Sequence, residues 1–183
     1  MSRIRSLKPN VTREEAVAQF SGGILNPFRD FAFGAVRSVA DTYIPFRLFE
    51  VSVSNRQRHE QHLLALDAVN GTLDLYRFEQ IPSPSEVVVL ETRNCPPGQL
   101  DDDHAGELVV EKFRRVLFSR GFFRLGELHI SATALPGEIH VPYWVALRGH
   151  SSRVHLEIID AVRRRYEGAK VRKLLETWLA ATQ

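Results

Sequence analysis

The sequence reads YIPFRL at residues 43–48 and HVPYWV at residues 140–145, and each stretch is followed by a histidine and then by an Asp-Ala-Val triplet. The histidine stands five residues before the aspartate in both copies, as His62 before Asp67 and as His155 before Asp160. A duplicated architecture explains such a repeated set of residues more simply than a duplicated chemistry does. The repeat therefore predicts two related sheet modules in one chain.

The residues around the first copy have the pattern of helices followed by strands. Thr12 and Glu15 form the signature of a capping box, so a helix is predicted directly after Thr12. A second short helix is predicted over residues 27–33, where Pro27 suits the first helical position. Alternating apolar and polar residues then predict strands between residues 36 and 78, and Asn70-Gly71 predicts a tight hairpin with its return strand directly after it.

The residues around the second copy repeat this order. Three aspartates at residues 101–103 suit the start of an amphipathic helix, where the macrodipole favours negative charge, and Gly121 is expected to end it. The strands predicted next cover residues 123–133, 138–148 and 154–162, with turns at 135–137 and 149–152. After Gly168, apolar residues at helical spacing predict a closing amphipathic helix.

These patterns predict an α+β protein made of two helix-plus-antiparallel-meander modules, an internal duplication, with a C-terminal amphipathic helix. The first module is expected to cover residues 1–80 and the second residues 101–183. Two proline clusters flank a short apolar piece between them, so residues 81–100 are expected to form a connector.

A family resemblance rests on the helix start TREEA at residues 12–16 and on LALDAVNGTL at residues 64–73. An alternating strand, Asp-Ala, a turn and a returning strand resemble the end of a PepSY domain, and the resemblance covers about residues 11–78. It implies a helix laid across an antiparallel sheet and a non-catalytic binding or inhibitory role. The second copy keeps Asp160-Ala161-Val162 but has residues 163–168 where the first has its Asn-Gly turn.

Composition narrows the class of protein. The chain has 183 residues, of which 44% are hydrophobic and 25% charged, as in one or two ordinary globular domains. Its one cysteine, Cys95, has no partner for an intrachain disulfide. The first residues lack the apolar run of a secretory signal and no stretch is long enough for a membrane span, so a cytoplasmic location is expected. A net charge of +2 is too small to indicate a polyanion partner. The excess of arginine, 20 Arg against 4 Lys, is typical of a GC-rich bacterial genome.

The repeated histidines and aspartates also suggest an alternative, an enzyme with a cleft between the modules in which His62, His155, Asp67 or Asp160 acts as acid or base. On a strand, residues five apart face opposite ways and lie about 16 Å apart, so the pair within one copy cannot meet. A cross-copy pair such as His62 with Asp160 stays open. Turn chemistry explains the aspartates more simply, as caps of the turn amides that follow them.

No catalytic residue, metal site or cofactor is therefore predicted. His59-x-x-His62 is a poor metal motif because residues three apart on a strand face opposite ways. The phosphate loop, the Gly-x-Ser-x-Gly elbow and the His-Glu-x-x-His helix are missing from the sequence. The chain is more simply interpreted as a non-enzyme.

Aromatic residues favour a protein-binding or assembly module, either a homodimer or an accessory subunit of a larger complex. Phe28, Phe31 and Phe33 lie with Ile24 and Leu25 in one glycine-bounded segment, which forms either an interaction patch or a roof over the first sheet. Tyr143 and Trp144 point to opposite faces of one strand, and whichever is exposed is a candidate hot spot.

A basic cluster supports a third hypothesis, that the protein binds RNA or DNA weakly. Its members are Arg163, Arg164, Arg165, Lys170, Arg172 and Lys173. Phosphate binding needs such a patch on one face. Arginine is also an ordinary solvated residue at a junction between strand and helix, and Glu167 and Glu176 dilute the cluster, so nucleic acid is the less favoured partner.

Overall fold

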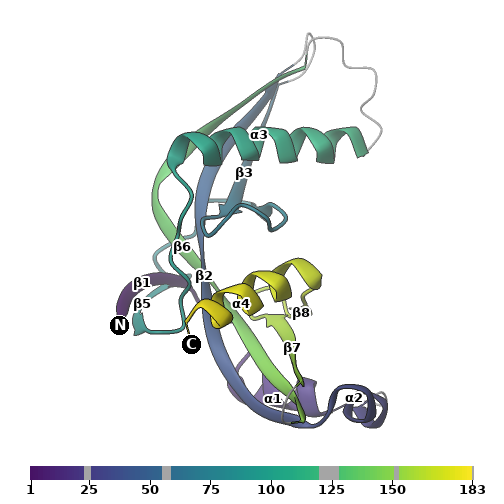
Figure 1. The fold of residues 1–183 in the computed structure, drawn as a ribbon. Coiled ribbons are helices and arrows are strands. Elements are labelled where there is room, and N and C mark those ends of the chain that lie inside the picture. Colours follow the sequence, from purple (N-terminus) through teal and green to yellow (C-terminus); the bar gives the residue numbers. More distant parts are fainter. Residues whose placement is uncertain (23–25, 55–58, 120–127, 151–152, 183) are drawn as a thin grey trace. The chain divides into compact units, whose positions relative to one another are not determined.

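The computed structural model describes residues 1–22, 26–54, 59–119, 128–150 and 153–182 (Figure 1). The helices of this part of the chain are α1 (Arg13–Ser21), α2 (Asn26–Phe33), α3 (Asp102–Ser119) and α4 (Ala169–Ala181). Its strands are β1 (Ser2–Leu7), β2 (Val36–Ser54), β3 (His59–Asp67), β4 (Tyr76–Phe78), β5 (Val87–Thr92), β6 (His129–His150), β7 (Arg153–Asp160) and β8 (Arg165–Tyr166).

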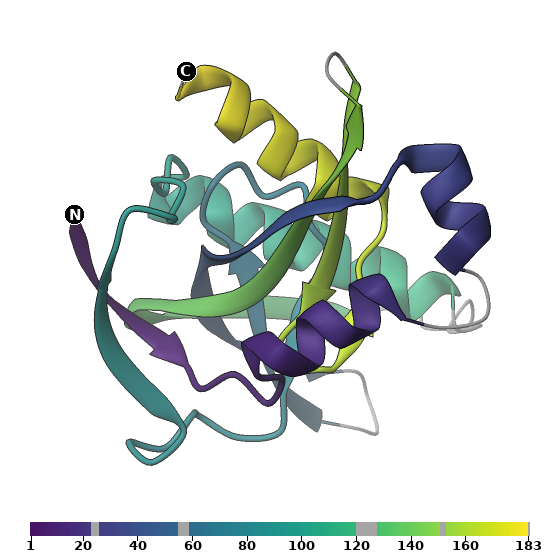
Figure 2. The same cartoon turned by 90° about the horizontal axis from the view of Figure 1, so that it is seen from below.

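The strands pair into one mixed sheet. Its hydrogen-bonded order is β4-β3-β2-β6-β1-β5, and β7 pairs with both β6 and β8. β1 is parallel to β6 at Ser6 and His140, whereas β3 is antiparallel to β2 and β4, and β7 is antiparallel to β6 and β8. Figure 2 shows β5 along the outer side of β1. The helices and this sheet confirm the predicted α+β class.

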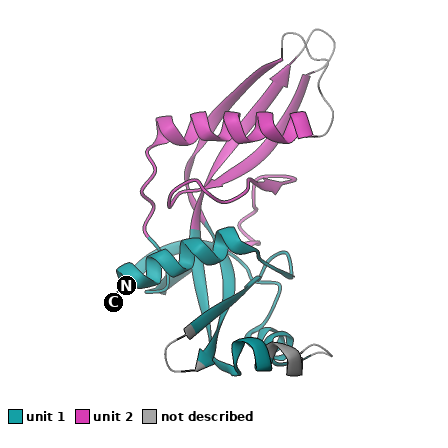
Figure 3. Ribbon diagram, turned by 45° about the vertical axis from the view of Figure 1, so that its right-hand side comes forward, with its two compact units in different colours: residues 1–44, 88–96, 140–183 teal, residues 45–87, 97–139 magenta. Residues whose placement is uncertain are grey.

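The chain divides into two compact units that are interleaved in sequence (Figure 3). Unit 1 comprises residues 1–44, 88–96 and 140–183, and unit 2 comprises residues 45–87 and 97–139. The long strands β2 and β6 each contribute one part to unit 1 and the other to unit 2. Each unit therefore takes segments from both predicted modules, whose boundaries stay a prediction about the sequence.

In unit 2, α3 covers the hairpin formed by β2 and β3 (Figure 1). Its buried residues follow one stripe at four-residue spacing, as a helix on a sheet requires: Ala105, Val109, Phe113 and Leu117. The same apolar cluster includes strand residues that alternate along β2 and β3: Phe49, Val51, Val53, Leu64 and Leu66. The helix predicted after the three aspartates thus packs on the hairpin that contains the first copy of the repeat.

In unit 1, α1 joins the hairpin formed by β6 and β7. Ala16 and Phe20 are buried in one cluster with Ala146, Ile159 and Ala161. The predicted capping box is confirmed, because Thr12 Oγ1 accepts from the Glu15 amide at 3.2 Å and Glu15 Oε2 accepts from the Thr12 amide at 2.8 Å. The closing helix is also confirmed as α4, which buries Val171, Leu174 and Leu175 in the same unit.

Two strand predictions are wrong. The turn expected at residues 135–137 does not interrupt β6, which runs continuously from His129 to His150. Gly137 has φ of +85°, a conformation typical of a β-bulge, which bends a strand without ending it. The tight hairpin at Asn70-Gly71 is also wrong, because β4 begins only at Tyr76 and a longer turn precedes it.

Other features of the chain fall outside these expectations. β1 was not predicted from the sequence, although Ile4 and Ser6 are buried and alternate with exposed arginines. The helix end at Gly121, the beginning of the strand expected from residue 123, the turn residues 151–152 and the apolar pair Ile24 and Leu25 lie outside the described residues.

Candidate functional site

Asp67 organises the turn that follows β3. The Asp67 side chain is fully buried, and its Oδ1 accepts from the amides of Asn70 at 3.0 Å and Gly71 at 2.9 Å. Its Oδ2 accepts from the amide of Leu73 at 2.8 Å. Gly71 has φ of +69°, and a Cβ there would lie 2.7 Å from Leu108 Cδ1, so the turn requires glycine. The carboxylate has the turn-capping role expected from the sequence.

Asp160 caps the corresponding turn after β7. Its side chain is also fully buried, and its Oδ1 accepts from the amides of Val162 and Arg163, both at 2.8 Å. Burial raises the pKa of Asp160, while the two amides and the neighbouring arginines act in the opposite direction. Both repeated aspartates therefore accept hydrogen bonds from backbone amides of the turn that follows them.

The alanine after each aspartate repeats a second set of hydrogen bonds. The Ala68 amide donates to the Pro45 carbonyl at 2.8 Å, and the Ala68 carbonyl accepts from the amides of Gln99 and Leu100 at 2.7 and 3.1 Å. The next residue, Asp101, caps α3 by accepting from the His104 amide at 2.8 Å. The first triplet thus binds the residues that lead into α3, the helix that covers the hairpin to which the triplet belongs.

The second triplet has the same arrangement in unit 1. The Ala161 amide donates to the Pro142 carbonyl at 3.0 Å, and its carbonyl accepts from the amides of Asn10 and Val11 at 2.7 and 3.0 Å. The next residue, Thr12, caps α1. In both units, therefore, the helix held by the triplet comes from the other half of the sequence.

The two histidines occupy matching places against aromatic rings. The His62 ring centroid lies 5.0 Å from that of Phe113 on α3, and its Nε2 lies 3.4 Å from Glu60 Oε2. The His155 ring stacks on Phe33 of α2, with centroids 4.3 Å apart and planes at 13°. Both rings thus contribute to packing between strand and helix. A pairing of His62 with Asp160, which belong to different units, stays a prediction.

His155 is expected to make the stability of unit 1 depend on pH. Burial, followed by the positive charge of Arg172, lowers the pKa of His155, although Glu157 and Glu176 oppose the shift. A histidine with a lowered pKa in the folded state stabilises the fold above its ordinary pKa of about 6.5, and this contribution is lost as pH falls through the folded-state value.

We therefore expect His155→Phe to flatten the loss of stability on acidification below about pH 6.5. The free energy of urea unfolding, measured at several pH values for the variant and the wild type, gives this slope. Asp160 and Glu167, whose raised pKa values act in the opposite direction, are common to both proteins and cancel in the difference. His59→Gln, at an exposed position, should keep the wild-type slope. Equal slopes for His155→Phe and the wild type would contradict the assignment.

A buried arginine that was not predicted from the sequence, Arg148, lies opposite His155 in the pairing of β6 with β7. The Arg148 side chain is fully buried, and Nη1 donates to Asp30 Oδ1 at 2.6 Å and to the Gly34 carbonyl at 3.2 Å. Nη2 donates to the Phe20 carbonyl, and Nε lies 3.0 Å from Glu157 Oε2. Arg148 thus joins the ends of α1 and α2 to β6 and β7. Its inward position in the alternation of β6 was the available signal.

The aromatic candidates fall into two groups. Phe31 on α2 is 90% exposed and Phe33 is 43% exposed, while Phe28 belongs to the same helix. Tyr143 is buried, and Trp144 packs against the α1 cluster of unit 1 while its Nε1 donates to the Val11 carbonyl at 2.8 Å. Tyr143 and Trp144 therefore contribute to the packing of unit 1.

Much of the basic cluster has partners within the chain. Arg164 donates to the Asn10 carbonyl, Arg165 Nε lies 3.1 Å from Glu167 Oε1, and Arg172 Nε donates to the Leu156 carbonyl at 3.0 Å. Arg163 lies beside Asp160, and Lys170 and Lys173 are exposed near the start of α4. At least three of these basic side chains therefore bind groups of unit 1 itself.

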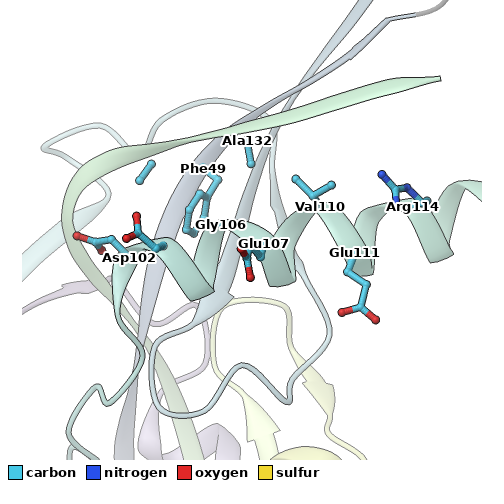
Figure 4. Close-up of a pocket in the computed structure, with 10 residues that line it drawn as sticks. Phe49, Asp102, Gly106, Glu107, Val110, Glu111, Arg114 and Ala132 are labelled. Carbon is cyan, nitrogen blue, oxygen red and sulfur yellow. The ribbon is translucent and has the colours of Figure 1, made fainter. Parts of the chain in front are cut away.

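Unit 2 has a groove of about 550 Å³ beside α3, which we call the α3 groove (Figure 4). Its apolar lining comes from Phe49 of β2, Val110 of α3, and Ala132 and Ala134. The remaining lining residues belong to α3 and are Asp102, Asp103, Gly106, Glu107, Glu111 and Arg114. The α3 groove thus combines an apolar floor with four carboxylates and one guanidinium.

Ion pairs occupy two of these carboxylates. Asp102 pairs with Arg47, whose Nε lies 3.5 Å from Glu138 Oε1, and Glu111 pairs with Arg115 one turn along the helix. Asp103 and Glu107 are exposed on the face of α3 that lines the groove. Asp101 confirms the helix-cap role predicted for residues 101–103, whereas the groove was not predicted from the sequence.

Among the described residues, no group of three or more His, Cys, Asp or Glu side chains is placed to hold a metal ion. No helix in the described part is both long enough and apolar enough to cross a membrane. No family model, curated protein or solved structure matches this sequence.

Proposed function

We propose that the protein is a non-catalytic binding module that holds a basic segment of a partner protein, anchored by apolar side chains, in the α3 groove. The observation that carries this proposal is the combination of apolar floor and acidic rim on one side of α3. Apolar contacts supply affinity at the centre of an interface, and complementary charges at its rim supply specificity and speed association.

The dimensions of the α3 groove suit a short peptide. From Asp102 to Arg114 the helix rises about 18 Å at 1.5 Å per residue, which matches five or six residues of an extended chain. Small residues leave the space open: a Cβ added at Gly106 would meet no atom within 4 Å. Lysine or arginine side chains of the partner would face Asp103 and Glu107 while its apolar side chains contact Val110 and Ala132.

We further propose that the two halves of the chain descend from a duplication. Three matched features support this origin: the turns after Asp67 and Asp160, the hydrogen bonds of the alanines that follow them, and the binding of each alanine to the segment before a helix. The resemblance of residues 11–78 to PepSY domains, which implies a non-catalytic binding role, agrees with the proposed function. These residues contribute to both units, so a PepSY-like arrangement would have to be formed with the second half of the chain.

A charge reversal in the α3 groove tests the function. We expect Glu107→Lys to weaken the binding of a synthetic peptide of alternating lysine and leucine by at least about tenfold, because like charges then face each other. Isothermal titration calorimetry measures the affinity, and a peptide of alternating glutamate and leucine should bind the wild type weakly or not at all.

Two variants sharpen this test. Glu14→Lys makes the same change of charge on the exposed surface of α1 and should leave peptide affinity unchanged. Gly106→Leu fills the groove at a helical position with open space, so binding should fall while the thermal midpoint stays the same or rises. Equal peptide affinity for the wild type and both groove variants would refute the proposed function.

A further inference from the structure

The edge strand β5 has a mostly apolar sequence with one acidic residue, Glu91. Among the described strands β5 pairs only with β1, so one row of its backbone amides and carbonyls has no partner strand. Its sequence, VVVLET, contains no proline, lysine or arginine, and the Val89 side chain is 56% exposed. Natural proteins usually protect edge strands by charge, proline or a bulge, because an open edge is a template for another strand.

We propose that β5 is the docking edge for a second copy of this chain, which pairs its own β5 antiparallel to the first and forms a symmetric dimer. One antiparallel register places apolar residues at the centre of such a pair. With Val89 on the two-fold axis, Val88 faces the partner's Leu90, and Val87 faces the partner's Glu91. Each pair then lies on one face of the joined sheet, as antiparallel pairing requires.

Charge placement favours this antiparallel arrangement over a parallel one. An in-register parallel pair would set Glu91 beside its own copy, and like charges directly opposite each other are destabilising. The antiparallel register separates the two carboxylates and joins the two exposed Val89 side chains. Prolines at positions 84 and 96 flank the strand and, having no amide hydrogen to donate, limit how far the ladder can extend beyond it.

Symmetry and size determine how such a dimer behaves. A two-fold contact uses the same patch on both copies, so the assembly closes at two chains and leaves neither β5 edge open. A ladder of six residues buries less surface area than the roughly 800 Å² per partner that is typical of a stable interface. The dimer is therefore expected to be reversible and to depend on protein concentration.

Sedimentation equilibrium of the full chain over a concentration series tests the proposal. We expect a monomer–dimer equilibrium whose dissociation constant rises by at least about tenfold in Val89→Lys, because two ammonium groups would meet at the two-fold axis. Ile81→Lys is the matched control: Ile81 is 57% exposed but lies outside the strand, so this variant should dimerise like the wild type. Amide hydrogen exchange in residues 87–92 should slow as the protein concentration rises.

Several results would overturn the proposal. A single monomeric species at all concentrations would do so, as would a dimer that Val89→Lys leaves intact or that Ile81→Lys weakens equally. Strand protection that appears only when an extended segment of a different protein is added would likewise assign the edge to that protein. Because β5 does not line the α3 groove, peptide binding there can succeed or fail independently of these outcomes.

Discussion

Replacing Arg148 with methionine is expected to destabilise the protein by about 3–5 kcal/mol, the typical cost of removing one partner from a buried ion pair. The substitution leaves Glu157, itself buried, without the guanidinium that lies 3.0 Å from its carboxylate. It also removes the donors to the carbonyls of Phe20 and Gly34 near the ends of α1 and α2. Carbonyls at helix ends need such donors when they are buried.

Urea denaturation followed by circular dichroism measures this loss. The double variant Arg148→Met with Glu157→Leu should recover part of the stability, because an apolar pair carries no uncompensated charge. Arg115→Met is the control: Arg115 also pairs with a glutamate, but the pair is exposed, and exposed pairs contribute little. Similar losses for Arg148→Met and Arg115→Met would show that burial of the guanidinium does not govern its contribution.

Asp67→Ala is expected to produce the other large effect, a loss of about 3 kcal/mol or more, because three amides lose their acceptor and each buried unsatisfied group costs about 1–3 kcal/mol. Asp160→Ala should cost less, since only two amides depend on that carboxylate. Equilibrium unfolding of both variants gives the order, and Asp67→Asn, which keeps one acceptor oxygen, should fall between Asp67→Ala and the wild type. A larger loss for Asp160→Ala would contradict the interpretation of the two turns.

Local sequence signals predicted the parts of the fold that depend on neighbouring residues. The capping box of α1, the position of α2, the aspartate at the start of α3 and the apolar stripe of α4 all follow from residues within one or two turns of helix. The capping roles of Asp67 and Asp160 were also predicted, because an aspartate in a turn contacts amides only a few residues away.

Features that depend on distant residues were not predictable in this way. The proline and glycine at residues 136 and 137 indicated a turn, yet pairing with other strands keeps β6 continuous. Arg148 has partners 114 to 128 residues away in the sequence, and no local pattern specifies them. The α3 groove also depends on spatial proximity, since Phe49 and Ala132 come from different strands and line it together with α3.

The origin of each covering helix has a consequence for how the protein is made. Trp144 bonds to Val11 across 133 residues, and Asn10 bonds to Val162 across 152 residues, so unit 1 can complete these contacts only after residue 162 has been synthesised. Contacts this far apart slow folding because a large loop must close before they form. During synthesis α1 therefore has no surface to cover until the hairpin of β6 and β7 has also been made.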